Sequence, residues 1–142
     1  MTQILSFVGV DIASASFMAC AGAAPWKVTV KPMQFDNVED GFVSFLDWLK
    51  EHNLTPEHTV VCMEATGVYS EGLAYFLYAS GYTVAVEPPL SIQRKFPVNA
   101  SKTDELDCQY IAEYACRYAD KLSFWKPRAE ILEQVKVLLT TR

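Results

Sequence analysis

The sequence predicts an α/β fold, a mixed five-stranded sheet with flanking helices. Short apolar runs rich in Val, Ile and Phe are typical of strands, and the first part of the chain has three of them separated only by short turns. Further on, strand-like runs alternate with segments of helical periodicity. Three antiparallel strands followed by strand–helix units give a mixed sheet with helices on its faces.

The first three strands are predicted over residues 4–12, 14–21 and 26–35. The first is an apolar run that ends near an acid, Asp11, and the third alternates around Val28 and Val30. Ala21-Gly22-Ala23-Ala24-Pro25 has the composition of a turn. We therefore expect an antiparallel meander.

A helix is predicted to begin after Asn37, with Asn37 as its N-cap, and to end near Asn53. Residues 59–64 form a short apolar strand that ends at Glu64, and a helix over 69–80 follows, with Gly81 as its stop. The fifth strand covers residues 82–86.

Residues 90–103 are predicted as a loop or short helix, 104–120 as a strong helix, and 129–142 as the start of an amphipathic, coiled-coil-like helix without a stop signal. The order β-β-β-α-β-α-β-α is that of the ribonuclease-H-like fold. We predict one domain over residues 1–122, with a linker and the start of a helical region over 123–142, and expect the chain to be a fragment.

The composition is that of an ordinary globular protein, since 51% of the 142 residues are hydrophobic and 20% are charged. No apolar run reaches the ~18–20 residues of a membrane span. The four cysteines form no Cys-x-x-Cys pair, so reduced, buried thiols in a cytoplasmic protein are the favoured interpretation. The net charge of −5 argues against a simple nucleic-acid-binding module.

Two acids are predicted at one edge of the sheet. Asp11 follows the first strand and Glu64 ends the fourth. If these strands are parallel neighbours, both carboxylates project from the carboxyl edge, where open α/β sheets bind ligands. The alternatives are a turn cap for Asp11 and a solvated strand end for Glu64.

Asp104 and Asp107 are three residues apart and share a helical face. Helix capping and the helix dipole explain both acids locally, and on this helix alone that interpretation is favoured. Four converging carboxylates would repel one another unless a divalent cation neutralised them. Oxygen ligands suit Mg²⁺ or Mn²⁺, and two such ions support phosphodiester chemistry.

Three segments, Val8-Gly9-Val10-Asp11-Ile12, Met63-Glu64-Ala65-Thr66-Gly67-Val68-Tyr69 and Lys102-Thr103-Asp104-Glu105-Leu106-Asp107, resemble the DEDD transposases of insertion sequences, which are related to the Piv invertases. The resemblance covers essentially the whole chain and implies a RuvC-like catalytic domain for DNA cleavage and strand transfer. The implied catalytic residues and Mg²⁺ (or Mn²⁺) ligands are Asp11, Glu64, Asp104 and Asp107. Cys108 departs mildly from the small residue that the family usually has there.

The resemblance also implies partners: DNA at the element ends and target, a structured guide RNA from the element, and further copies of the full-length protein. It implies a following domain with a serine that acts on DNA. Residues 88–103 contain no acid, and a basic strip would border the metal site. The candidate DNA-contacting residues are Arg94, Lys95, Lys102 and Thr66, whereas Tyr69, Tyr110, Tyr114 and Tyr118 are expected to pack in the core rather than stack on bases.

Three alternatives remain at this point. A RuvC-like junction-resolving endonuclease would share the metal site. A sugar kinase or actin-like ATPase would need glycine-rich phosphate loops, and Ala13-Ser14-Ala15-Ser16 contains no glycine. A non-catalytic dimerisation or nucleic-acid-binding fragment would not need all four acids.

Overall fold

The computed structural model describes residues 3–88 and 104–127, with side chains from Asp107 onward in the second stretch. The elements, in chain order, are β1 (Ser6–Ile12), β2 (Ser16–Ala23), β3 (Lys27–Asp36), α1 (Glu39–Glu51), β4 (Thr59–Glu64), α2 (Val68–Ala79), β5 (Thr83–Glu87), α4 (Asp104–Arg117) and the short 3₁₀ helix η1 (Ala119–Lys121). This order confirms the predicted one. The predicted loop at 90–103, the helix at 129–142 and the basic residues within them lie outside the described residues.

The five strands form one sheet in the order β3-β2-β1-β4-β5. β1 pairs antiparallel with β2, and β2 with β3, whereas β4 is parallel to both β1 and β5. The mixed sheet and the parallel β1–β4 pair are therefore as predicted. Because β1 lies in the centre, its carboxyl end is flanked by β2 and β4.

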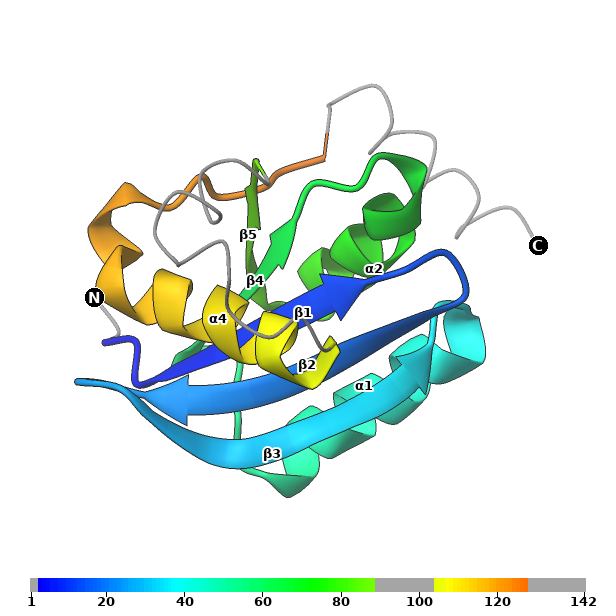
Figure 1. Cartoon of the computed structure of the whole chain (residues 1–142). Coiled ribbons are helices and arrows are strands. Elements are labelled where there is room, and N and C mark those ends of the chain that lie inside the picture. Colours follow the sequence, from blue (N-terminus) through cyan, green and yellow to red (C-terminus); the bar gives the residue numbers. More distant parts are fainter. Residues whose placement is uncertain (1–2, 89–103, 128–142) are drawn as a thin grey trace.

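The helices cover the two faces of the sheet unequally. Figure 1 shows α4 in front of the sheet and α1 with α2 behind it. The rear core is large and aromatic, and Phe17, Phe35 and Phe45 lie in it with ring centroids 5.2–5.4 Å apart. The front core, under α4, is smaller and includes Phe7, Ile111 and Tyr114. Small residues on this side let α4 lie close to the strands.

Three local predictions were wrong. The Asn37 side chain caps no helix, because the N-cap of α1 is Val38, in extended conformation and without a side-chain cap bond. β2 begins at Ser16 rather than at 14, because the Ala13 amide bonds to the Ser16 carbonyl at 2.8 Å and closes a tight turn. α4 ends at Arg117, and the chain continues in the 3₁₀ turn of η1 rather than as helix to 120.

Residues 123–125, predicted as part of a linker, lie along the outer edge of β5. Val86 N–H bonds to Ser123 O at 3.2 Å, Trp125 N–H bonds to Val84 O at 2.8 Å, and Phe124 forms an antiparallel bridge with Ala85. Trp125 also packs edge-on against Tyr75 of α2, with centroids 4.8 Å apart. The segment that follows α4 is thus fastened to the sheet. Among the described residues, no helix is long and apolar enough to cross a bilayer.

Candidate active site

Asp11 and Glu64 lie side by side at the carboxyl ends of β1 and β4. The parallel register pairs Val10 with Met63, and the two acids are the next residues on each strand. Side chains alternate along a strand, so Asp11 shares the face of Gly9, which lies against α4. Glu64 likewise shares the face of Cys62, which packs in the core under α4. Asp11 is the last residue but one of β1, and both acids lie on the sheet face that α4 covers.

The third acid, Asp107, comes from α4, which crosses β1 at very short range. A Cβ atom added to Gly9 would collide with the carbonyl oxygen of Cys108 and would lie 2.8 Å from the Ala112 Cβ. Only a residue without a side chain allows this approach. Because Cys108 follows Asp107 directly, the contact brings Asp107 over the end of β1.

The three carboxylates share one electrostatic environment. Burial raises the pKa of Glu64 above its usual value, and the negative charges of Asp11 and Asp107 raise it further. This is the effect expected when like charges gather at one site. The structure thus brings together three of the four acids that the sequence singled out. Asp104 begins α4, one turn before Asp107, but its side chain lies outside those described, so its role stays a prediction.

Sequence analysis missed a further acid, Glu87. It ends β5 in register with Glu64 and is only 3% exposed. Its Oε1 accepts a hydrogen bond from Tyr114 Oη at 3.0 Å, and its Oε2 accepts one from the Ser123 amide at 2.6 Å. The pattern of an apolar strand ending in an acid, which marked Asp11 and Glu64, is present here too.

The sequence model of the IS110-type DEDD transposases, described as a transposase, matches residues 8–142. That match spans nearly the whole chain, including the three converging acids. The chain belongs to this transposase family. The match confirms the resemblance that the three motifs indicated.

Two curated relatives of this transposase chain are pilin gene-inverting proteins. The protein of Moraxella bovis is 29% identical over 139 residues, and that of Moraxella lacunata is 28% identical over 142. Each alignment covers 96% of this chain but 42% of the relative. The chain therefore spans less than half the length of these relatives.

The fold is that of RuvC. A structure of Thermus thermophilus RuvC in complex with a Holliday junction substrate superposes with a TM-score of 0.63 at 9% sequence identity, over 85% of this chain and 99% of the other. A second T. thermophilus RuvC structure gives 0.62 at 11% identity, over 85% and 100%. These likenesses confirm the predicted ribonuclease-H-like fold.

The donor chemistry of this candidate site fits a hard divalent cation. Asp11, Glu64 and Asp107 offer only carboxylate oxygens, which Mg²⁺ and Mn²⁺ prefer. Besides burial, their mutual repulsion raises the pKa of Glu64, and a cation would relieve that repulsion. Within residues 3–88 and 107–127, no three acids, cysteines or histidines already form a closed metal-binding group.

The cysteines near the site are neutral thiols. Burial raises the pKa of Cys62 far above its usual value, with added contributions from the charges of Glu87 and Glu64. A hydrogen bond with Cys20, together with burial, does the same for the pKa of Cys108. All four cysteines are free, and three are buried, as predicted. Thiols held in this form are poor metal ligands.

The loop after Glu64 forms the rim of the site. The Ala65 amide bonds to the Glu87 carbonyl at 2.8 Å, and Gly67 caps α2 with a φ of 65°. The hydroxyl of Thr66, a predicted DNA-contacting residue, is buried and has no hydrogen-bond partner among the described residues. Next to it, Val68 is 74% exposed and Tyr69 is 50% exposed. The prediction that Tyr69 packs in the core was wrong, whereas for Tyr114, which is 5% exposed, it is confirmed.

Asn37 ties this rim to the turn after β1. Its Nδ2 donates to Tyr69 O at 2.9 Å and to Ala13 O at 3.2 Å. Tyr69 lies 32 residues and Ala13 24 residues from Asn37 in the sequence. Asn37 therefore connects the segments that follow Asp11 and Glu64, a role that its position before a helix concealed.

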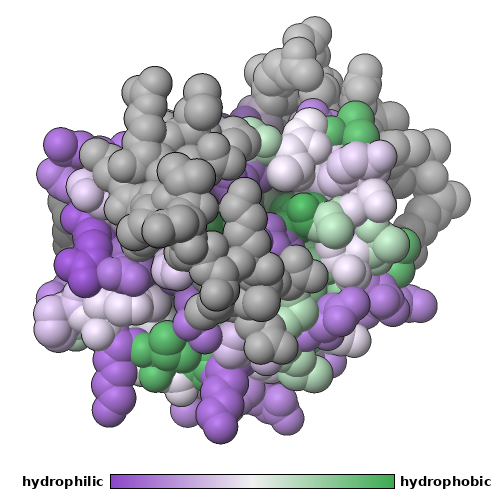
Figure 2. Space-filling view, in the orientation of Figure 1, coloured by the Kyte–Doolittle hydropathy of each residue, from purple (hydrophilic) through white to green (hydrophobic). Residues whose placement is uncertain are grey.

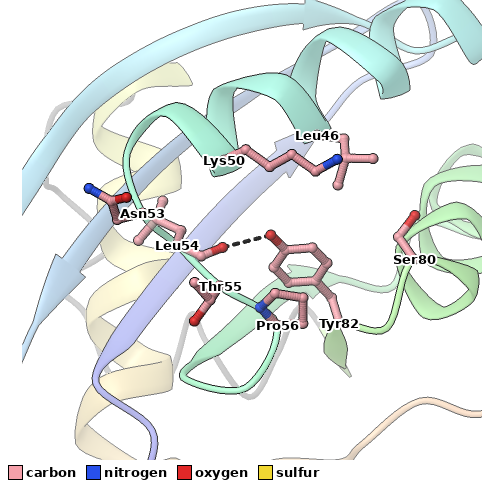
Figure 3. A pocket seen from close by; sticks show the side chains of 8 residues that line it. All are labelled: Leu46, Lys50, Asn53, Leu54, Thr55, Pro56, Ser80 and Tyr82. Atoms are coloured by element: carbon pink, nitrogen blue, oxygen red, sulfur yellow. Dashed lines mark hydrogen bonds between the residues drawn. The ribbon is translucent and has the colours of Figure 1, made fainter.

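Two hollows in the surface lie away from the candidate site formed by Asp11, Glu64 and Asp107. The first, of about 380 Å³, lies between the ends of α1 and α2 and the start of β5, where Tyr82 Oη donates to Leu54 O at 2.6 Å (Figure 3). This is the opposite edge of the parallel strands. The second, of about 460 Å³, lies between β3 and α1 and includes four acids, Asp36, Asp40, Asp47 and Glu51. Neither hollow includes any of the predicted site residues.

Proposed function

We propose that the chain forms the catalytic domain of a DNA transposase or site-specific recombinase that cleaves and rejoins phosphodiester bonds with the help of Mg²⁺ or Mn²⁺. The observation that carries this proposal is the convergence of Asp11, Glu64 and Asp107 at one edge of a RuvC-like sheet. The family match supplies the reaction class.

In this proposal Asp11, Glu64, Asp104 and Asp107 hold the metal. When bound, the ion would activate the attacking oxygen and stabilise the leaving oxygen of the phosphodiester. The strand pair β1–β4 fixes Asp11 and Glu64 relative to each other, and Gly9 sets the depth at which α4 carries Asp107. Two of the acids are therefore held rigidly by the sheet, and the third is carried by α4.

DNA is proposed to lie on the α4 side of the molecule. The hollow between β3 and α1 includes four acids and would repel phosphates. Figure 2, in the orientation of Figure 1, shows the α4 side, where hydrophilic side chains gather along the left and lower borders. Lys121 and Lys126, which follow α4 in the sequence, are exposed, whereas Arg117 of α4 forms an ion pair with Glu113 at 2.6 Å. Arg94, Lys95 and Lys102 would add phosphate contacts beside the acids.

Val68 and Tyr69 are proposed to contact nucleotides next to the cleaved bond. They are large, exposed and four to five residues from Glu64, at the start of α2. Aromatic side chains at such rims stack on unpaired bases. Thr66, whose buried hydroxyl has no partner among the described residues, is the polar group of this rim. The names of the relatives and of the junction-bound RuvC are consistent with a DNA substrate.

A guide RNA and assembly with further copies complete the proposal for the whole protein. Both rest on the family resemblance, because this chain covers 42% of its curated relatives. Metal binding is the part of the proposal that can be measured with this chain alone.

The decisive experiment is a calorimetric titration of the chain with MnCl₂. We expect binding by the wild type and at least a tenfold loss in Asp11→Asn and Glu64→Gln, since each removes a charged ligand. Asp47→Asn is the matched control, because Asp47 is an exposed acid on α1, beside the other hollow. Equal affinity in all four proteins would contradict the metal site.

A further inference from the structure

The geometry points to Glu87 as a positioning residue of the carboxylate site: its buried side chain ties α4 and the Ser123 segment to the end of β5, and so fixes Asp107 over Glu64. Only the metal-binding consequence of this inference rests on the proposed function. The placement of α4 by Glu87 does not.

Glu87 is placed as a neighbour of the site rather than as one of its ligands. It pairs with Glu64 across β4 and β5, on the sheet face that α4 covers. Both of its carboxylate oxygens accept hydrogen bonds, from Tyr114 Oη and from the Ser123 amide. A carboxylate that is 3% exposed needs such donors to remain in place. With both oxygens occupied, Glu87 is suited to hold the protein together.

The spacing along α4 explains how Glu87 acts on Asp107. Tyr114 follows Asp107 by seven residues, which is two turns and about 10 Å along the same helix face. On the sheet, β1 and β5 are separated by β4, so they lie two strand spacings, also about 10 Å, apart. α4 is therefore fixed at two points, by Gly9 under Cys108 and by Glu87 under Tyr114.

The environment of Tyr114 supports this second point of attachment. Burial, the hydrogen bond to Glu87 and the charge of Glu87 raise the pKa of Tyr114 to about 12. The hydroxyl therefore stays protonated and remains a donor. On its other side, Glu87 holds the Ser123 amide at the point where residues 123–125 run along β5 (Figure 1). One buried carboxylate thus joins the end of β5 to two segments that lie 27 and 36 residues further along the chain.

The test compares the 142-residue chain with Glu87→Gln, Tyr114→Phe and the double variant. Tyr114→Phe is the milder change, because it keeps the ring and removes only the hydroxyl. Glu51→Gln, an exposed glutamate on α1, is the matched control. The readouts are Mn²⁺ affinity by calorimetry, amide hydrogen exchange of α4, and the absorbance of tyrosinate during an alkaline titration.

We expect Glu87→Gln and Tyr114→Phe each to weaken Mn²⁺ binding about 10-fold while the chain stays folded, since residues that orient metal ligands have effects of this size. The double variant should lose much less than the product of the two, because both changes act on the same contact between Glu87 and Tyr114. Amides at the amino-terminal half of α4 should exchange faster. The pKa of Tyr114, about 12 in the wild type, should fall in Glu87→Gln but stay above the usual value, because the burial that raises it most remains.

The outcomes separate the two proposals. Unchanged α4 exchange and unchanged Mn²⁺ affinity in folded Glu87→Gln and Tyr114→Phe would overturn the positioning role and leave the metal site intact. A wild-type chain that binds no Mn²⁺, but whose α4 exchange rises in both variants, would overturn the metal site and support the placement of α4 by Glu87.

Discussion

Gly9 of β1 and Cys108 of α4 are in such close contact that a side chain on Gly9 would collide with the Cys108 carbonyl oxygen. These two residues stand next but one to Asp11 and next to Asp107, respectively. The distance between two of the proposed metal ligands is therefore set by backbone packing rather than by the ligands themselves. A site arranged in this way is sensitive to changes that touch no acid.

Replacing Gly9 with alanine tests this relationship. The added methyl must push α4 away from β1, so we expect the free energy of unfolding to fall by about 1–3 kcal/mol, as for other overpacked cores. Urea denaturation measures the loss. Gly72→Ala is the control, because a Cβ there meets only Phe42 at 3.4 Å and sits within α2, where alanine gains up to about 1 kcal/mol. Equal effects of the two substitutions would contradict the close packing of α4.

Glu64 predicts an unusual dependence of stability on pH in the absence of metal. Its pKa is raised in the folded chain by burial and by Asp11 and Asp107. A carboxyl with a raised pKa favours folding when protonated, and that contribution is lost as the pH rises from the usual value of about 4.3 through the folded-state pKa. In EDTA at pH 7, Glu64→Gln should therefore melt at a higher temperature than the wild type.

The difference in melting temperature between Glu64→Gln and the wild type should shrink as the pH is lowered towards 4. A variant that is less stable than the wild type at pH 7 would show that Glu64 is held by favourable contacts rather than by a repulsive cluster. Acids that are arranged to bind a cation are expected to destabilise the folded chain when the cation is absent.

Bound metal should stabilise the wild type more than the variants that lack one of the acids. A ligand that binds only the folded state at 100 times its dissociation constant adds about 2.7 kcal/mol to stability. Saturating Mn²⁺ should raise the melting temperature of the wild type and of Asp47→Asn, and should raise that of Asp11→Asn clearly less. The measurement is a thermal melt followed by circular dichroism, with and without excess EDTA. The same upward shift in Asp11→Asn would place the ion elsewhere.

The sheet could be predicted well because each strand is recognisable from its local sequence, as an apolar run bounded by turns. The same local signal placed Asp11 and Glu64, since an acid that ends a buried strand is rare without a partner. The same pattern is present at Glu87, which lies one residue beyond the predicted strand and directly before Pro88, but ends β5 in the structure.

Contacts between distant segments could not be predicted in this way. Gly9 looks like any strand glycine until α4 is placed over it. Tyr69 and Tyr114 share a residue type, yet one is 50% and the other 5% exposed, because α2 turns its first residues outward and α4 lies flat on the sheet. Whether Asp104 joins the other acids depends on the same tertiary placement.

Substitutions of Asn37 distinguish the helix N-cap that the sequence predicts from the hydrogen bonds that the structure shows. As a helix N-cap, asparagine is replaced by aspartate at almost no cost. In the structure, its Nδ2 instead donates to the carbonyl oxygens of Ala13 and Tyr69, which a carboxylate cannot do. Asn37→Asp should therefore destabilise the chain at least as much as Asn37→Ala, by about 1–2 kcal/mol in urea denaturation. Hydrogen exchange should also rise at the start of α2 and in the turn after β1. A fully stable Asn37→Asp variant would return Asn37 to the capping role and leave the rim of the site without its connection to the turn after β1.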